Sequence, residues 1–400
     1  MKFWIGQSIS VFGSQFSPFA IQAIAIGTLL ASDTQLGFLT FFNTIPFLVL
    51  GLLVGVWTDR HRRRRIMIYA DFGRATVLFS IPAIFLIFGL VGLTMNLLYA
   101  VTLLAGVLTV FFEIAYQANI PSFVRKNQIV DANSKLEASR SFAQVIGPSA
   151  AGFALGVITA PLVVFGDVVG YMSSSLSLLS IKRPEPDMAS AQRGTTWHDI
   201  REGLSVVFRD KKLRAIAGTT ATSNLFSNAF GAITIKYLNV NLGLSFTVIA
   251  IAFGVGSVGG VIGALTSGRY IENLGVGRSM IVGAVIGSLP AIAYYFAVPS
   301  DALAVTTAVV FFTSLGVLWY NIPQVSYRQA VVPEGVQGRM NATMRTIVWG
   351  TIPVGGLIGG VVGDLIGTQA TMGLMAALGT LSFIWVLLSP VRSVKEFPAH

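Results

Sequence analysis

Cysteine is absent from this chain and charge is scarce: of 400 residues none is cysteine, three are histidine and 11% are charged. The first absence excludes disulfides, thiolate metal sites and a cysteine nucleophile. His61, His198 and His400 lie far apart in the sequence, and no group of His, Asp and Glu has the spacing of a metal site. We therefore predict no cofactor and no enzymatic activity, with a membrane-embedded enzyme as a remote alternative.

The shortage of charge also excludes an ordinary water-soluble surface. A typical globular domain has about 25% charged residues, whereas this chain is 54% apolar. The net charge of +10 does not predict nucleic-acid binding, because the basic residues lie in short loops between apolar segments and do not alternate with stacking aromatics. A nucleotide-binding G-x-x-x-x-G-K-[ST] sequence is absent as well, so nucleotide is not the expected energy source.

Long apolar segments are what the chain has in abundance. A helix needs roughly 20 apolar residues to cross a bilayer, and twelve segments approach that length. We therefore predict an all-α integral membrane protein with twelve transmembrane helices. The segments cover residues 3–30, 36–57, 66–90, 95–118, 140–160, 162–181, 214–240, 246–268, 279–298, 302–325, 346–366 and 370–389.

The basic residues predict how these helices are oriented. If both termini are cytoplasmic, every Lys and Arg except Lys236 falls on the inner side, while the outer loops carry little but Asp33, Asp301 and Asp364. Such an asymmetry is typical of multi-pass proteins, whose cytoplasmic loops are rich in Lys and Arg. The predicted location is the plasma membrane.

The chain also repeats itself, as secondary transporters do. Three short patterns recur in the same order at separations of 202 to 208 residues: Gly51-x-x-x-Gly55 as Gly259-x-x-x-Gly263, Asn119-Ile120-Pro121 as Asn321-Ile322-Pro323, and the pair Arg140 and Pro148 as Arg345 and Pro353. We predict two pseudo-symmetric six-helix bundles, residues 1–181 and 214–400, joined by a cytoplasmic linker, residues 182–213. Within the linker, Thr196-x-x-Asp199 predicts the start of a short interfacial helix, and the alternative is a frayed linker.

Three motifs give the sequence a family resemblance. Gly55-x-x-x-Asp59-Arg60-x-x-Arg63-Arg64 follows the second apolar segment, Asp71-x-x-Arg74 lies in the third, and Gly147-Pro148-x-x-x-Gly152 lies in the fifth. The chain thereby resembles the major facilitator superfamily, and within it the bacterial efflux branch of macrolide and enterobactin exporters. It departs from that pattern at Arg62, where the family usually has glycine, and at Ser14, where some relatives have an acid.

The resemblance implies a secondary transporter that works by alternating access and exports amphipathic small molecules in exchange for protons. The expected partners are therefore such a substrate, the proton and the lipid bilayer, and we expect a monomer. A siderophore or lysophospholipid exporter of the same fold is the alternative. The small residues around Pro148 favour a bent, closely packed helix, which in the family accompanies export.

In the family, the loop after the second helix latches the two halves together. Carried over to this sequence, the latch residues are Gly55, Asp59, Arg60, Arg63, Asp71, Arg74 and Arg345. Asp59 at a helix end can accept hydrogen bonds from a facing helix start and from guanidinium groups. The alternative is that Arg62 to Arg65 only fix the topology, and we predict that losing one of these four arginines has little effect.

Glu113 is the strongest candidate for chemistry within the membrane, because an ionisable group at that depth is costly and usually marks a pathway or relay. We predict that it binds a proton or a cationic substrate, and the alternative is a structural hydrogen bond. Other polar residues are predicted to line a central cavity or to bond neighbouring helices: Gln15, Gln22, Asn43, Asn224, Asn228, Tyr320 and Asn321. Asp167, Asp364 and Lys236 are interpreted as interface or capping residues.

Overall fold

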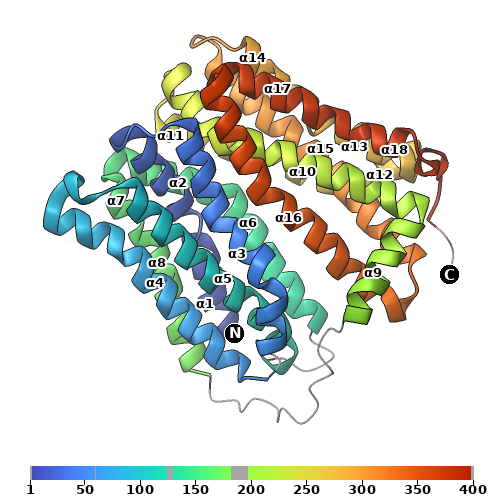
Figure 1. Ribbon diagram of the computed structural model, residues 1–400, viewed down its shortest axis with the longest axis horizontal. Coiled ribbons are helices and arrows are strands. Elements are labelled where there is room, and N and C mark those ends of the chain that lie inside the picture. Colours follow the sequence, from blue (N-terminus) through green and yellow to red (C-terminus); the bar gives the residue numbers. More distant parts are fainter. Residues whose placement is uncertain (1, 59, 124–128, 182–196, 398–400) are drawn as a thin grey trace. The chain divides into compact units, whose positions relative to one another are not determined.

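The computed structural model describes residues 2–58, 60–123, 129–181 and 197–397, and throughout these ranges the chain is helical without a strand (Figure 1). Asp59, at the centre of the predicted latch, lies outside the described residues, as does most of the predicted linker. A helix does form at the end of the predicted linker: α9, Trp197–Arg209, packs against α10 and α16, and its position at the membrane surface stays a prediction.

The first six predicted segments are all helical. Their elements are α1 Lys2–Gly13, α2 Phe16–Ala23, the π-helical turn η1 Ile24–Thr28, α3 Asp33–Thr58, α4 Arg63–Phe88, the 3-10 turn η2 Gly89–Gly92, α5 Met95–Phe123, α6 Ile129–Val157, α7 Ala160–Val163 and α8 Phe165–Leu179.

The last six segments are helical too. Their elements are α10 Lys211–Lys236, the π-helical turn η5 Tyr237–Asn241, α11 Phe246–Gly256, α12 Val258–Leu274, α13 Val276–Ile286, η6 Leu289–Ile292, α14 Ala293–Phe296, α15 Ala302–Val331, α16 Glu334–Ile366, α17 Thr368–Thr380, η7 Leu381–Phe383, α18 Ile384–Leu387 and η8 Pro390–Ser393.

Ten spans of the described chain are long and apolar enough to cross a membrane. The two other predicted segments, 140–160 and 214–240, correspond to α6 and α10, which are helices of 29 and 26 residues but carry more polar side chains. The prediction of an all-α membrane protein with twelve helical segments is thus confirmed.

Helix boundaries differ from the prediction in two ways. The first segment is not one helix, because turns at Ser14 and Gln15 separate α1 from α2. Several helices also continue past their apolar segments: α15 reaches Val331, and α16 begins at Glu334 instead of near residue 346. An apolar segment ends at the first charged residues, but the helix can continue beyond them, because its backbone hydrogen bonds also form in polar surroundings.

The sequence repeat has a structural counterpart. The first helical segment ends in the π-helical turn η1, and α10, which is the corresponding segment of the second half, ends in the π-helical turn η5. Pro148 and Pro353, which were paired in the sequence, both lie inside long helices, α6 and α16.

The described chain forms two compact units. Unit 1 contains residues 1–31, 42–194 and 246–254, and unit 2 contains residues 32–41, 195–245 and 255–400. α3 therefore begins in unit 2 and continues into unit 1. The bundle limits at residues 181 and 214 stay a prediction. Each unit has buried apolar side chains of its own, such as Met67 and Leu178 in unit 1 and Met340 and Tyr327 in unit 2.

Candidate functional site

Unit 1 encloses a polar cavity of about 810 Å³. Side chains from α1, α4, α5, α6 and α8 line it, among them Gln7, Arg74, Glu113, Arg140 and Tyr171. Gln15 and Ser14, at the break between α1 and α2, also line the cavity. The volume lies within the range of roughly 300–1,000 Å³ that is usual for small-molecule sites.

Arg74 is the most enclosed charge in this cavity wall. It is 4% exposed and pairs with Asp71, one helical turn earlier on α4, which is completely buried. Its guanidinium carbon lies 4.2 Å from the ring centre of Phe112 and 4.1 Å from that of Tyr171. The sequence correctly paired Asp71 with Arg74 but assigned both to the latch, whereas Arg74 lies eleven residues into α4, about 16 Å along the helix. We therefore assign Arg74 to the cavity.

Glu113 faces the same cavity from α5. Its Oε1 lies 3.9 Å from Nη2 of Arg140 on α6, and the side chains are 21% and 47% exposed. This separation is longer than a direct hydrogen bond, and both groups are accessible from the cavity. The pair is therefore a loose one that a proton or a charged ligand can enter.

Unit 2 has a second cavity, of about 390 Å³, lined from α10, α13, α15 and α16. Three predicted site residues, Asn224, Tyr320 and Asn321, line it, and so does Arg345, which had been assigned to the latch. The sequence analysis missed Gln324 and Arg328 on α15. The spacing of Asn321, Gln324 and Arg328, at i, i+3 and i+7, could have revealed them, since such residues share one helix face.

The remaining predicted cavity residues lie elsewhere. Gln22, Asn43 and Asn228 do not line either cavity. Asn228 instead donates a hydrogen bond from Nδ2 to the main-chain oxygen of Asn224, at 2.8 Å. Asn43 is exposed, and its main-chain oxygen lies against Gly106 of α5. The sequence does not show which neighbouring helix a polar side chain on an apolar helix will contact.

The α6 motif produces close packing, as predicted. A Cβ built on Gly147 would lie 2.3 Å from Cγ of Gln15, and one built on Gly152 would lie 1.9 Å from Cβ of Ala250 in α11. Thr247 Oγ1 donates a hydrogen bond to the main-chain oxygen of Gly152 at 2.9 Å. Glycine is therefore needed at both positions for the helices to approach.

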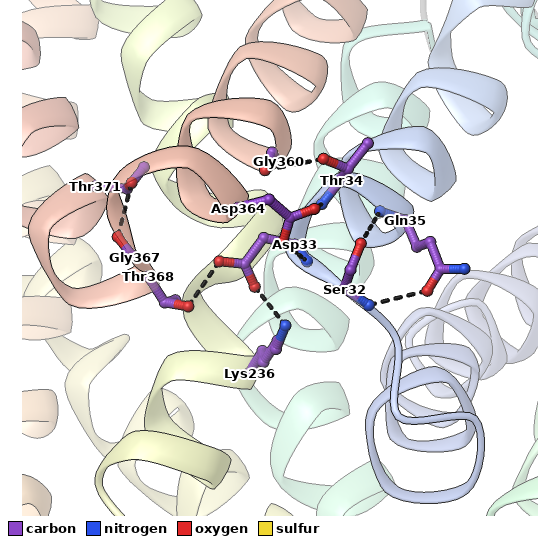
Figure 2. A network of polar contacts seen from close by, with 10 residues as sticks. All are labelled: Ser32, Asp33, Thr34, Gln35, Lys236, Gly360, Asp364, Gly367, Thr368 and Thr371. Atoms are coloured by element: carbon purple, nitrogen blue, oxygen red, sulfur yellow. Dashed lines mark hydrogen bonds and ion pairs between the residues drawn. The ribbon is translucent and has the colours of Figure 1, made fainter.

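A third polar cluster surrounds the start of α3 in unit 2 (Figure 2). Asp33, which is 1% exposed, forms an ion pair with Lys236, with Nζ 2.7 Å from Oδ1, and accepts a hydrogen bond from Thr368 Oγ1 at 2.6 Å. The carboxylate of Asp364 accepts hydrogen bonds from the main-chain nitrogens of Asp33 and Thr34, at 2.9 and 3.0 Å. The interpretation of Asp364 and Lys236 as capping and interface residues is confirmed.

Two more features hold this helix start. Ser32 and Gln35 form a reciprocal capping box, with distances of 2.9 Å from Ser32 N to Gln35 Oε1 and 3.3 Å from Gln35 N to Ser32 Oγ. Glycines of α16 let the backbones approach, because a Cβ built on Gly360 would lie 2.5 Å from the main-chain oxygen of Asp33. The sequence analysis treated Asp33 as a loop residue and did not anticipate the cluster.

The described part of the predicted latch is less distinctive. A Cβ built on Gly55 would meet no atom within 4 Å, and Arg60 is exposed. Arg62, where the family has glycine, precedes α4 with φ −65° and ψ 107°, which any residue adopts. Arg64 is anchored to α8, because Nε and Nη2 donate to the main-chain oxygens of Leu178 and Leu179, at the end of that helix, at 2.8 and 3.1 Å. Arg63 begins α4.

A polytopic helical chain with polar cavities inside its helix bundles has the architecture that a membrane transporter requires. The chain belongs to the Major Facilitator Superfamily, whose family model matches residues 3–352.

Curated relatives and solved structures agree with this assignment. The chain is 23% identical over 384 residues to Macrolide efflux protein A of Streptococcus pyogenes, covering 92% of this chain and 89% of the relative. It is 25% identical over 369 residues to the Multidrug efflux pump Tap of Mycolicibacterium fortuitum, covering 88% and 86%. The structure of a bacterial homologue of the iron transporter ferroportin in an inward-facing state matches with a TM-score of 0.72 at 17% identity, covering 96% of this chain and 98% of that one. The similarity to the ferroportin homologue shows that the two chains share a fold.

Proposed function

We propose that this protein exports amphipathic small molecules in exchange for protons by alternating access, and that Glu113 is the residue at which proton and substrate compete. The observation that carries the proposal is the loose pair of Glu113 and Arg140 in the wall of the unit 1 cavity. Export is supported by the efflux function in the names of the two relatives.

An ionised side chain within the membrane, such as that of Glu113, has a high free-energy cost. A carboxylate there needs a counter-charge or a proton. Arg140 supplies the counter-charge at 3.9 Å, too far for a strong charge-assisted hydrogen bond. A proton on Glu113, or an ammonium group of a bound substrate, replaces part of that interaction. Binding of either ligand therefore disfavours binding of the other, which is the condition for exchange.

The walls of the cavity suit an amphipathic substrate. Tyr116 of α5 offers a ring surface, backed by the buried ring of Phe112, whose centre lies 5.8 Å away in a stacked arrangement. Gln7, Gln15 and Ser10 offer hydrogen-bonding groups on the α1 and α2 side. A ligand with an apolar body and a few polar atoms matches both.

The latch around Gly55, Asp59 and Arg345 remains part of the proposal, as do cytoplasmic termini and a monomeric state. Asp59 lies outside the described residues, and its part in the latch is carried over from the family resemblance. Asp59→Asn is expected to reduce transport without reducing the amount of protein in the membrane.

Everted vesicles that contain the protein test the function. With an imposed pH gradient, acid inside, rhodamine 123 should accumulate, and a protonophore should abolish the accumulation. Glu113→Gln should reduce accumulation and its dependence on the gradient, while the matched control Glu272→Gln, at an exposed position of α12 outside both cavity linings, should keep both. Accumulation that survives the protonophore would contradict proton coupling.

A further inference from the structure

The cavity in unit 2 is positively charged. Arg328 and Arg345 line it, and no acidic side chain is among its lining residues in the described chain. The cavity in unit 1 differs, because Glu113 and Glu137 line it together with two arginines. A site whose only full charges are guanidinium groups attracts anions.

Arg328 is the residue that carries the inference. It is partly buried on α15, and its Nε is enclosed without a hydrogen-bond partner. Within the described ranges no carboxylate forms an ion pair with it. Enclosed charges in proteins are normally paired, because an unpaired charge that has left water is costly. Arg328 is therefore a partly buried cation without an acidic partner among the described residues, and an anion is the ligand that would complement it.

Polar groups surround Arg328 in the cavity wall. Thr219 on α10 is completely buried and lines the cavity. Gln324, 4% exposed, donates from Nε2 to Asn321 Oδ1 at 3.2 Å. The Tyr320 hydroxyl is already engaged, at 2.7 Å from the Thr220 hydroxyl and 3.2 Å from the main-chain oxygen of Ile216.

An apolar surface adjoins these donors. Trp349 lines the cavity, and the guanidinium carbon of Arg345 lies 5.2 Å from the centre of its ring. Met344 and Val348 of α16 add apolar side chains. The cavity therefore offers donors for an anionic group and an apolar wall for the body attached to it.

We propose that the unit 2 cavity binds the oxyanion group of an amphipathic ligand, with Arg328 as its main partner. Carboxylate, phosphate and sulfonate groups share the required chemistry, because each accepts two hydrogen bonds from one guanidinium group. The inference rests on the proposed function and narrows it, since substrates that carry an acidic group are preferred over the same molecules without one.

A matched pair of dyes tests the preference. Rhodamine 110 is a free acid, and rhodamine 123 is its methyl ester, so the two differ in one anionic group. Binding of each dye to the purified full-length protein, in nanodiscs of neutral lipid, is measured by fluorescence anisotropy. A charge-assisted hydrogen bond in an enclosed site predicts that the free acid binds about tenfold more tightly.

Variants assign the preference to Arg328. Arg328→Met should remove it, and Arg328→Lys should keep a part of it, because lysine keeps the charge but not the paired donors. Arg278→Met, an exposed arginine on α13 outside the cavity lining, should leave the preference unchanged. Gel filtration and thermal unfolding of each variant separate loss of binding from loss of folding.

Two competitors distinguish the sources of the anion. Inorganic phosphate should displace rhodamine 110 at millimolar concentration if the site accepts any oxyanion, and dihexanoyl phosphatidic acid should do so at lower concentration if it selects lipid headgroups. Equal binding of the two dyes to the wild type, or a preference that persists in Arg328→Met, overturns the inference. The vesicle experiment tests the proposed function independently of this site. Accumulation of rhodamine 123 driven by the pH gradient would support proton-coupled export even if the anion site were disproved, and its absence would contradict proton-coupled export.

Discussion

Nζ of Lys236 lies 2.7 Å from Oδ1 of Asp33, at the point where α3 begins. Lys236 is the one basic residue that the charge distribution places on the outer side, and the ion pair accounts for this exception. Through this pair and the cap from Asp364, α3 is held to α10, α16 and α17 by its first turn. From Phe42 onward α3 belongs to unit 1.

Asp33→Asn should destabilise the protein by about 3 kcal/mol, because removing one partner leaves the Lys236 charge enclosed without its counter-ion. Thermal unfolding of the purified protein measures the effect. Exchange of the two residues, Asp33→Lys with Lys236→Asp, should restore a part of the stability. Asp301→Asn serves as the control, since Asp301 accepts a hydrogen bond only from its own loop, from Val298 N at 2.9 Å. Equal unfolding of Asp33→Asn and Asp301→Asn would show that the ion pair does not stabilise the fold.

A methyl group should be tolerated at Gly55 and rejected at Gly152. A Cβ at Gly152 overlaps Cβ of Ala250, so Gly152→Ala should cost about 1–3 kcal/mol as an overpacked site. Gly55→Ala meets no atom within 4 Å and should be neutral or slightly stabilising, because alanine favours a helix. Thermal unfolding of both variants decides the matter, and equal effects would contradict the packing described for α6.

Arg74→Met should destabilise the protein by about 3 kcal/mol or more, because Asp71 would be left buried without a counter-charge. The double variant with Asp71→Asn should recover much of this loss, since no net charge then remains. Urea-induced unfolding in detergent reports on both. If the double variant is no more stable than Arg74→Met alone, the unpaired charge of Asp71 is not the cause of the loss of stability.

Loss of Arg64 should matter more than loss of Arg62. Arg64 donates two hydrogen bonds to the end of α8, and hydrogen bonds from charged groups contribute about 1.5 kcal/mol, less where the group is partly exposed. Arg62 is exposed at the start of α4. Arg64→Ala should therefore lower the unfolding temperature, and Arg62→Ala should not. This outcome would correct the expectation from the sequence that the four arginines are equivalent.

The fold could be predicted from the sequence because the bilayer imposes a length and a polarity on each segment. Hydropathy located the twelve segments, and the Lys and Arg distribution gave an orientation to test. Helix ends were less predictable. The continuation of α15 to Val331 and the break at Ser14 depend on backbone hydrogen bonds and on packing, which a hydropathy pattern does not contain.

The site could be predicted in part. Glu113 stood out because an acid is rare in an apolar helix, and the structure places it in a cavity. Arg74 was recognised but assigned to the latch, because its position in a motif does not reveal which way its helix faces. Asp33 was missed because its partner, Lys236, lies far away in the sequence. Arg328 was missed because a sequence does not show that a side-chain nitrogen will be buried without a hydrogen-bond partner.

The central claim is that export of the substrate is coupled to entry of protons. It is tested most directly by measuring proton entry that is driven by a substrate gradient, without an imposed pH gradient. Proteoliposomes loaded with rhodamine 123 and the pH indicator pyranine, at equal pH on both sides, are diluted into dye-free buffer. As the dye leaves through the protein, exchange requires protons to enter, so the interior should become acidic, and faster than in protein-free liposomes. Glu113→Gln should abolish this difference. Exit of the dye through the wild-type protein without any change of internal pH would contradict proton-coupled export.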